Sequence, residues 1–380
     1  MDKQFDELSK SLAEGVALRG ALRKFGIGLA CVLLAVLVMA AAPMAQADGY
    51  LLVSSLNTNS ILRYNETTGA FVDAFVLGKS GGLRDPFGLV FGPDHNLYVS
   101  SGIEADNGTG HRDVLRFDGT TGAFLDDFAD QNLLTSPRAV LFGPDGNLYV
   151  ADTLLSNIPV NLGQVVRFNG VTGAFMDYFV PPGSGGLSNQ AGMVFGPNGT
   201  HDGGFDLYIA VIFQAQILRF DGRTGAFKGV FVSSGSGGLI NPAGVVFGPD
   251  GNLYVANSNL DGIPGNVLVY QGPGGPSPGA FLGKFVTDGS GGLLQPYGIL
   301  FGPDGNNDGK RDLYVASASI SWKSFGTGLQ AAPGTSTVLR YDGTTGAFKS
   351  VFVSAGSGGL QNPIFMTFTE TNPTTLNYGQ

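Results

Sequence analysis

One short segment of the chain carries oxygen-bearing side chains at a spacing that suits calcium. It reads Asp304-Gly-Asn306-Asn-Asp308-Gly-Lys-Arg-Asp312, with oxygens at positions 1, 3, 5 and 9 and glycine at position 6, as in EF-hand loops. The glutamate of position 12 is missing, and Asn198–Asp206 repeats the skeleton with weaker ligands. We expect a structural, non-catalytic calcium ion at these four side chains, or alternatively an Asx-rich turn whose carboxylates cap backbone amides.

Side chains suited to acid–base catalysis are scarce. The chain has three histidines, and only His111 falls in a segment that also holds a glutamate, Glu104. These two side chains could serve lyase chemistry as a pair. No second polar group of the needed type is expected to converge on them from elsewhere, so a solvated loop histidine is the simpler interpretation. We predict no catalytic residue, keep Glu104 and His111 as the alternative, and leave open whether the protein is an enzyme.

Repeats dominate the rest of the chain and must position any site. The phrase VLRFDGTTGAF at Val114–Phe124 occurs in six versions, and a second phrase, FGPDGNLYVA, alternates with it. The other five versions of the first phrase are Ile61–Phe71, Val165–Phe175, Ile217–Phe227, Val267–Phe281 and Val338–Phe348. Units of about 50 residues with this content of strands and turns are typical of the blades of a β-propeller.

Each unit contains four short segments rich in Val, Leu, Ile, Phe and Tyr, separated by Gly, Asp, Asn or Pro. We expect strand a at segments such as 244–247, strand b at 253–256, strand c in the VLRF type and strand d at segments such as 226–232. The FGPDGN and DGTTG segments have turn chemistry. No 3.6-residue apolar period runs through residues 49–370, so almost no helix is expected there.

The count of strands predicts how the array ends. Strands c and d occur six times, and strand b occurs six times if Tyr50–Ser54 is included, but strand a precedes an FGP turn only five times. The sixth strand a is Ile364–Phe368, near the C-terminus. The first and last strands are therefore expected to share one blade, which removes two open sheet edges. The prediction is an all-β, closed six-bladed propeller of four-stranded blades.

The segment Asn241–Ala256 (NPAGVVFGPDGNLYVA) resembles the NHL repeat, whose units read approximately P-x-G, three apolar residues, D-G and Y-V-A-D. The resemblance covers residues 49–370 and implies a six-bladed propeller. Only Asp152 reproduces the family's usual aspartate after Y-V-A. The resemblance says little about activity, because such propellers host lyases, lactonases and binding platforms alike.

The segments outside the array are residues 1–47 and 371–380, which we interpret as an export leader and a C-terminal tail. The leader combines an amphipathic, helical start, Arg23-Lys24, the apolar run Phe25–Ala42 and a small-residue cleavage site at Ala45–Ala47. It is similar to a twin-arginine leader with one arginine missing. We expect export to the periplasm, the cell surface or the extracellular space, with the leader cleaved or kept as the only membrane anchor.

Composition restricts the partners. Without the five basic and four acidic residues of the leader, the chain keeps 16 basic and 26 acidic residues, a net charge of −10. Nucleic acid is therefore not expected to bind. The only cysteine, Cys31, lies in the leader, so no disulfide is expected in the propeller.

The two faces of the propeller are expected to differ. The a–b and c–d turns, nearly identical between copies, share what we call the uniform face. The b–c and d–a connections share the opposite, variable face, and the b–c loops differ strongly in length. GSGGL segments recur in the d–a connections. A strand, not a helix, follows each, so we expect a backbone requirement and no phosphate site.

The residue after each strand-a proline position should line the channel mouth on the variable face. These residues are Phe87, Arg138, Ala191, Ala243, Tyr297 and Ile364. Unequal loops on a uniform scaffold are typical of binding sites. We predict an exported binding module for a protein, peptide or carbohydrate. Its ligand-binding residues are expected to be Phe87, Arg138, Asp152, Asn257, Tyr297 and Trp322. The alternatives are a lyase or lactonase using Glu104, His111, Asp152 and Asn257 around a channel-mouth metal, and a structural cell-surface protein.

Overall fold

The computed structural model describes most of the repeat array. The described residues are 49–102, 112–129, 133–154, 162–200, 202–259, 263–305, 308–319 and 335–369. The predicted leader and C-terminal tail lie outside these ranges, as do Glu104, His111, Asn306 and Trp322. Within the described ranges, no helix has the length and apolar character needed to cross a bilayer.

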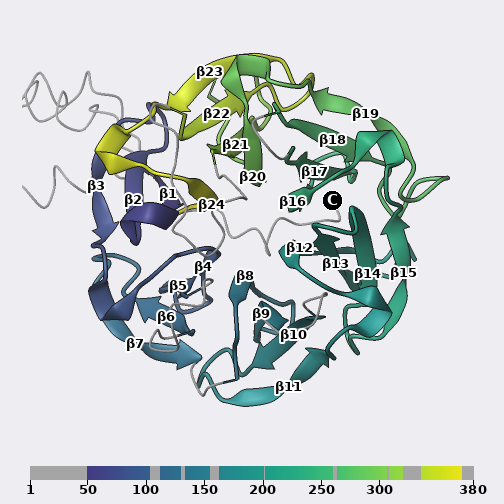
Figure 1. Ribbon diagram of the computed structural model, residues 1–380, viewed down its shortest axis with the longest axis horizontal. Helices are drawn as coiled ribbons and strands as arrows, with labels where there is room; N and C mark the ends of the chain where they lie inside the picture. The colour runs from purple at the N-terminus through teal and green to yellow at the C-terminus, as the bar shows by residue number, and fades with distance from the viewer. Residues whose placement is uncertain are drawn as a thin grey trace, which may run out of the picture. The chain divides into compact units, whose positions relative to one another are not determined.

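The described part of the chain forms six four-stranded antiparallel sheets arranged around an axis, a six-bladed β-propeller (Figure 1). The innermost strand of each sheet is its strand a. Sheet 1 consists of β24 (Pro363–Phe368), β1 (Tyr50–Ser55), β2 (Ser60–Asn65) and β3 (Phe71–Val76). Sheet 2 consists of β4 (Leu89–Phe91), β5 (Leu97–Ser100), β6 (Val114–Phe117) and β7 (Phe124–Ala129). Sheet 3 consists of β8 (Pro137–Phe142), β9 (Leu148–Leu154), β10 (Leu162–Phe168) and β11 (Phe175–Val180).

The remaining sheets follow the same order from the axis outward. Sheet 4 consists of β12 (Gln190–Pro197), β13 (Phe205–Val211), β14 (Gln216–Asp221) and β15 (Phe227–Val232). Sheet 5 consists of β16 (Pro242–Phe247), β17 (Leu253–Asn257), β18 (Asn266–Tyr270) and β19 (Phe281–Val286). Sheet 6 consists of β20 (Gln295–Phe301), β21 (Leu313–Ala318), β22 (Thr337–Tyr341) and β23 (Phe348–Val353). Helical structure in the described ranges is limited to single 3₁₀ turns, namely η1 (Leu56–Thr58), η2 (Ser80–Gly82), η3 (Ser184–Gly186), η4 (Ser236–Gly238), η5 (Ser290–Gly292) and η7 (Ser357–Gly359).

The repeated turns form for the local reasons that the sequence indicates. In the FGPDGN turn between β16 and β17, the Asp250 carboxylate accepts hydrogen bonds from the Asn252 amide and side chain and from the Tyr254 hydroxyl. Gly251 follows with φ of +76°, a conformation that glycine adopts without strain. The predicted turn residues are therefore the ones that stabilise these hairpins.

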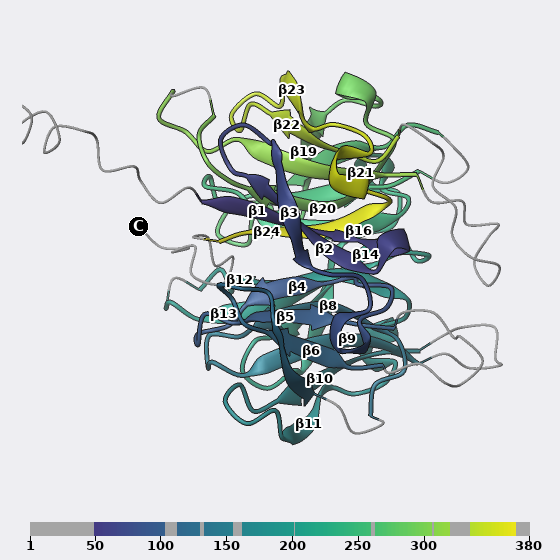
Figure 2. The same ribbon diagram turned by 90° about the vertical axis from the view of Figure 1, so that its left-hand side faces the viewer.

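The two ends of the array lie in one sheet, as the strand count predicts. β24 pairs antiparallel with β1, with Leu51 opposite Phe368 and Val53 opposite Met366, and the side view shows the two strands side by side (Figure 2). The Thr369 amide extends the pairing by donating to the Tyr50 carbonyl at 2.9 Å. Closure of the array into a ring by this pairing stays a prediction, and truncation of β24 tests it.

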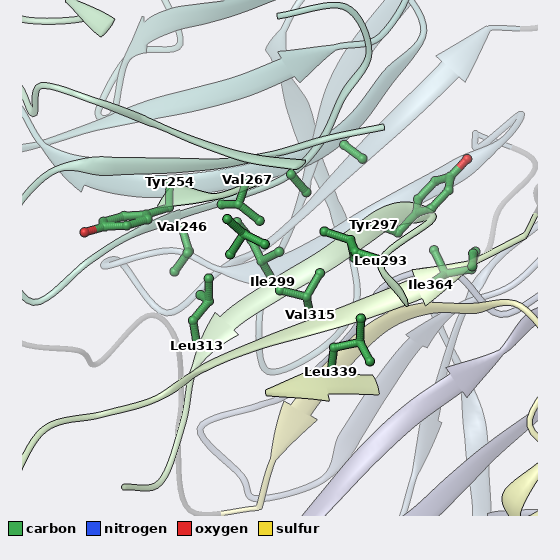
Figure 3. Close-up of a cluster of buried hydrophobic side chains, with 14 of the residues drawn as sticks. Val246, Tyr254, Val267, Leu293, Tyr297, Ile299, Leu313, Val315, Leu339 and Ile364 are labelled. Carbon is green, nitrogen blue, oxygen red and sulfur yellow. The ribbon is translucent and has the colours of Figure 1, made fainter. Parts of the chain in front are cut away.

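Aromatic side chains pack between successive sheets. At the seam between sheets 5 and 6, the Tyr254 and Phe301 rings meet edge to face at 5.0 Å between centroids. Tyr254 lies in a buried cluster together with Ile299, Leu313 and Val315 (Figure 3). The tyrosine at the equivalent position of strand b makes the same contact with the last phenylalanine of strand a in the next sheet at other seams, in Tyr98–Phe142, Tyr149–Phe195, Tyr208–Phe247 and Tyr314–Phe368. The repeated segments therefore supply the aromatic side chains that pack between neighbouring sheets as well as the strands themselves.

Candidate functional site

Three of the predicted ligand-binding residues meet at the variable end of the axis. The Arg138 guanidinium lies 5.6 Å from the centroid of the Phe87 ring, and the Phe87 and Tyr297 rings are 6.4 Å apart. We call Phe87, Arg138 and Tyr297 the axial cluster. All three are buried, so burial raises the pKa of Tyr297, while the positive charge of Arg138 acts in the opposite direction. The structure therefore brings these three side chains together in a buried cluster, and their role in ligand binding stays a prediction.

Asp152 in β9 and Asn257 at the end of β17 occupy equivalent positions, and both accept amides of the connection that precedes strand a. One Asp152 carboxylate oxygen accepts the backbone N–H groups of Thr135 and Ser136 at 2.8 and 2.7 Å. The other oxygen accepts a hydrogen bond from the Gln164 side chain at 2.9 Å. Burial raises the pKa of Asp152, and these hydrogen bonds oppose that effect. This carboxylate thus caps backbone amides of the d–a connection, an arrangement that we call the latch. Its role in ligand binding stays a prediction.

The latch recurs around the propeller at the position after the LYVA phrase. The Asn257 side-chain oxygen accepts the amides of Ile240 and Asn241 at 2.8 and 3.2 Å. The hydroxyls of Ser101, Ser317 and Ser55 each accept one amide of the corresponding d–a connection. The sequence signal was a short polar residue at this position in five of six units. It points to local backbone capping, because Asp, Asn and Ser are the side chains that cap amides best.

The predicted calcium loop is closed by its own side chains. The Asp304 carboxylate accepts the amides of Asp308 and Gly309, at 3.3 and 2.7 Å, and Asp308 accepts the amide of Lys310 at 2.9 Å. Gly309 has φ of +82°, as the sharp turn requires. No group of three or more His, Cys, Asp or Glu side chains that could hold a metal ion occurs in the described ranges. The geometry corresponds to the alternative of an Asx-rich turn, and calcium binding stays a prediction.

The last acidic residue of each inserted turn has a structural partner that sequence reasoning missed. In three sheets, an arginine of strand c pairs with the aspartate opposite it on strand d. These pairs are Arg63–Asp73, Arg116–Asp126 and Arg167–Asp177. In the sheets with inserted turns, Gly229 and Ser350 stand at the strand-d position instead, opposite Arg219 and Arg340.

The inserted turns supply the missing carboxylate. Arg219 pairs with Asp206, and the Arg340 Nε lies 3.6 Å from the Asp312 carboxylate. Asp206 and Asp312 are each only 1% exposed, and a buried charge needs a partner of opposite charge. Each of these aspartates therefore serves an arginine of strand c that has no aspartate opposite it on strand d. Burial raises the pKa of Asp312, and the Gly305 amide and Arg340 counteract it. The signal in the sequence was the loss of the strand-d aspartate in the same units that gained the insertion.

Calcium at about 1 mM is expected to raise the melting temperature of the protein by about 2 °C. A dissociation constant of about 0.1 mM corresponds to about 1.4 kcal/mol of stabilisation at this concentration, which for a domain of this size gives a shift of that order. Differential scanning fluorimetry measures it, with magnesium as the ionic-strength control and Asp308→Ala as the matched variant. Equal melting curves with and without calcium would overturn the calcium site.

The axis itself encloses an apolar cavity of about 100 Å³. Its lining comes from the innermost strands, including Val90, Val140, Val194, Val246, Ile299 and Met366. No carboxylate, histidine or cysteine is among the described residues that line it. A metal at this place would need ligands from residues such as Glu104 and His111, which lie outside the described ranges. The described residues around this cavity are therefore mainly apolar.

The described part of the variable face exposes large apolar side chains. Phe213 in the b–c connection of sheet 4 is 59% exposed, and Ile263 in that of sheet 5 is 60% exposed. Ile240, in the connection between these sheets, is 51% exposed. We call Phe213, Ile240 and Ile263 the apolar rim. Exposed apolar side chains on neighbouring connections are typical of surfaces that bind another molecule.

Comparisons with known proteins support the fold. No family model and no curated protein matches the chain. A chain from the crystal structure of a nidogen/laminin complex is similar, with a TM-score of 0.56, 16% identity and coverage of 84% of this chain and 98% of that one. A protein of unknown function from Bacteroides caccae has a TM-score of 0.55 and 12% identity, covering 86% and 100%.

Lactonase-like proteins are also among the similar structures. A candidate 6-phosphogluconolactonase from Bacteroides uniformis has a TM-score of 0.48 and 15% identity, covering 85% of this chain and 100% of that one. A likeness of this degree carries no conclusion about the activity of this chain. Membership of the NHL-repeat family stays a prediction.

Proposed function

We propose that this protein is an exported binding module that docks a protein or peptide on its variable face. The apolar rim carries the proposal, because Phe213, Ile240 and Ile263 are each more than half exposed on connections of neighbouring sheets. The d-strand phenylalanines recur in every blade and serve the scaffold, whereas Phe213 and Ile263 lie in b–c connections whose sequences differ from blade to blade. Blade-specific apolar side chains on a uniform scaffold are what a selective binding surface needs.

The axial cluster supports the same face. Arg138 brings a charged group to the axis beneath the variable connections, and Phe87 and Tyr297 hold it in place. Aromatic side chains and arginine are enriched among residues that dominate binding energy at interfaces. The enzyme alternative depends on Glu104 and His111 in the undescribed part of the chain, and the described axial cavity adds nothing to it.

Panning a random peptide library displayed on phage tests the proposal. Peptides enriched on the purified protein are expected to lose at least about tenfold in affinity for the double variant Phe213→Ser/Ile240→Ser, because each buried apolar side chain contributes about 1.5–3 kcal/mol. Val171→Ser is the matched control, since Val171 is 82% exposed but lies in a c–d turn of the uniform face. Failure to enrich peptides, or enriched peptides indifferent to the double variant, would contradict the proposal.

A further inference from the structure

A groove of about 700 Å³ lies on the uniform face, between sheets 3 and 4. One wall is the inserted turn at Asn198–Asp206, which lengthens the hairpin so that Pro197 of β12 pairs with Phe205 of β13. The other walls are the a–b turn of sheet 3 and the c–d turn of sheet 4. Its volume falls in the range of about 300–1,000 Å³ that is typical of small-molecule sites. The inserted turn supplies Asn198, Asp202, Gly203, Gly204 and Phe205 to the lining of the groove.

Charged side chains of both signs line this groove, and most are fixed by the protein itself. The Asp145 carboxylate accepts the Tyr149 hydroxyl at 3.0 Å and lies 3.6 Å from the Arg167 guanidinium. Asp202 accepts the Gly204 amide at 2.8 Å, and Asp221 accepts the amide and hydroxyl of Thr224. These hydrogen bonds therefore hold the three carboxylates in defined positions.

The hydrogen bonds of Thr200 and Gly204 lower the pKa of Asp202 to about 2, and those of Thr224 lower the pKa of Asp221. Both groups are ionised at neutral pH. Each accepts these backbone amides through one carboxylate oxygen, and both residues line the groove, so acceptor capacity remains on each carboxylate.

Arg223 contributes the donor that is not committed elsewhere. It is exposed in the c–d turn of sheet 4, and no ion pair within the described ranges involves its guanidinium. The equivalent residue is Thr120 in sheet 2 and Thr344 in sheet 6, so the turn itself does not require arginine. Phe205, which is 36% exposed, adds a partly open aromatic ring to the same groove.

We propose that this groove binds a short neutral oligosaccharide. Sugar hydroxyls donate to carboxylates and accept from guanidinium groups, which matches the alternation of Asp202, Asp221 and Arg223. The apolar face of a sugar ring fits against Phe205. An anionic ligand would meet three carboxylates on a chain of net charge −9, and an apolar ligand would desolvate ionised groups without compensation. This site lies opposite the variable face, so it is independent of the proposed peptide-binding surface.

Isothermal titration with cellotetraose, maltotetraose, xylotetraose and chitotetraose tests the inference on the purified full-length protein. At least one of the four is expected to bind with a dissociation constant of about 1 mM or tighter. Arg223→Thr is expected to weaken it at least about tenfold, because charge-assisted hydrogen bonds contribute most of the specificity. Arg223→Thr restores the residue of the sister turns and should fold normally, which a thermal melt verifies.

Two further variants sharpen the result. Asp202→Asn keeps the oxygen that accepts the Gly204 amide but removes the charge, and it is expected to weaken binding as well. Thr344→Ala, in the equivalent turn of sheet 6, is the matched control and should bind as the wild type does. The absence of binding for all four sugars at about 10 mM, or binding that Arg223→Thr leaves unchanged, would overturn the inference. The variant Phe213→Ser should not affect sugar binding, which separates this site from the variable face.

Discussion

Deleting residues 363–380 is expected to leave a chain that no longer unfolds cooperatively. The deletion removes β24, the innermost strand of sheet 1 and the partner of β1. Ile364, Met366 and Phe368 are almost fully buried, and their loss removes about 6 kcal/mol of apolar burial. That amount is comparable with the whole stability of a typical domain, about 5–15 kcal/mol.

The matched control is deletion of residues 371–380 alone. This shorter deletion should leave the melting temperature and the near-ultraviolet circular dichroism spectrum unchanged. If the longer deletion retained a cooperative melt near the wild-type temperature, pairing of the chain ends would not be what closes the array. The comparison therefore tests ring closure directly. Loss of β24 breaks its backbone hydrogen bonds to β1 and leaves an open sheet edge.

Gly225→Ala is expected to destabilise the protein by about 3 kcal/mol or more. Gly225 lies in the c–d turn of sheet 4 with φ of +70°, and a Cβ there would stand 1.7 Å from the Phe179 carbonyl oxygen of sheet 3. A backbone atom cannot move aside as a flexible side chain can, so the sheets must separate. The same glycine abuts the carbonyl of the preceding sheet in all six c–d turns, at Gly69, Gly122, Gly173, Gly225, Gly279 and Gly346.

Two other glycines separate the cost of the backbone conformation from the cost of the clash. Gly146 has φ of +74° but no atom near the position of a Cβ, so Gly146→Ala should cost only about 1 kcal/mol. Gly283 has open space and no left-handed φ, so Gly283→Ala should change stability by about 0.5 kcal/mol at most. Urea unfolding measures all three. A loss for Gly225→Ala no larger than for Gly146→Ala would show that the seam is loose.

The GSGGL segments illustrate how far repeat patterns reach. Their repetition predicts a backbone requirement, and the structure identifies it. Gly237 has φ of +61°, and a Cβ on it would lie 2.1 Å from the Phe281 ring of the next sheet. The sequence shows that a glycine is needed here, since only glycine adopts this conformation freely. The identity of the ring that presses on it depends on how two sheets pack, which no local pattern encodes.

The strands, their turns and the number of sheets follow from the sequence, because alternating apolar residues and turn residues act over a few neighbours. β16 and β17, for example, begin and end within two residues of the expected segments. Pairing of the first strand with the last also follows, since counting leaves one strand a without its sheet.

Only the tertiary structure shows which partners the polar residues meet. The sequence predicts Asp152 as a ligand-binding residue, and the structure adds that it accepts the amides of Thr135 and Ser136. The sequence predicts Asp312 as a calcium ligand, and the structure adds that it pairs with Arg340, which has no aspartate opposite it on strand d. The reason is physical. A carboxylate suits a metal, an amide or an arginine equally well by type, and the partner it meets depends on which segments the packed sheets bring within about 3 Å of it.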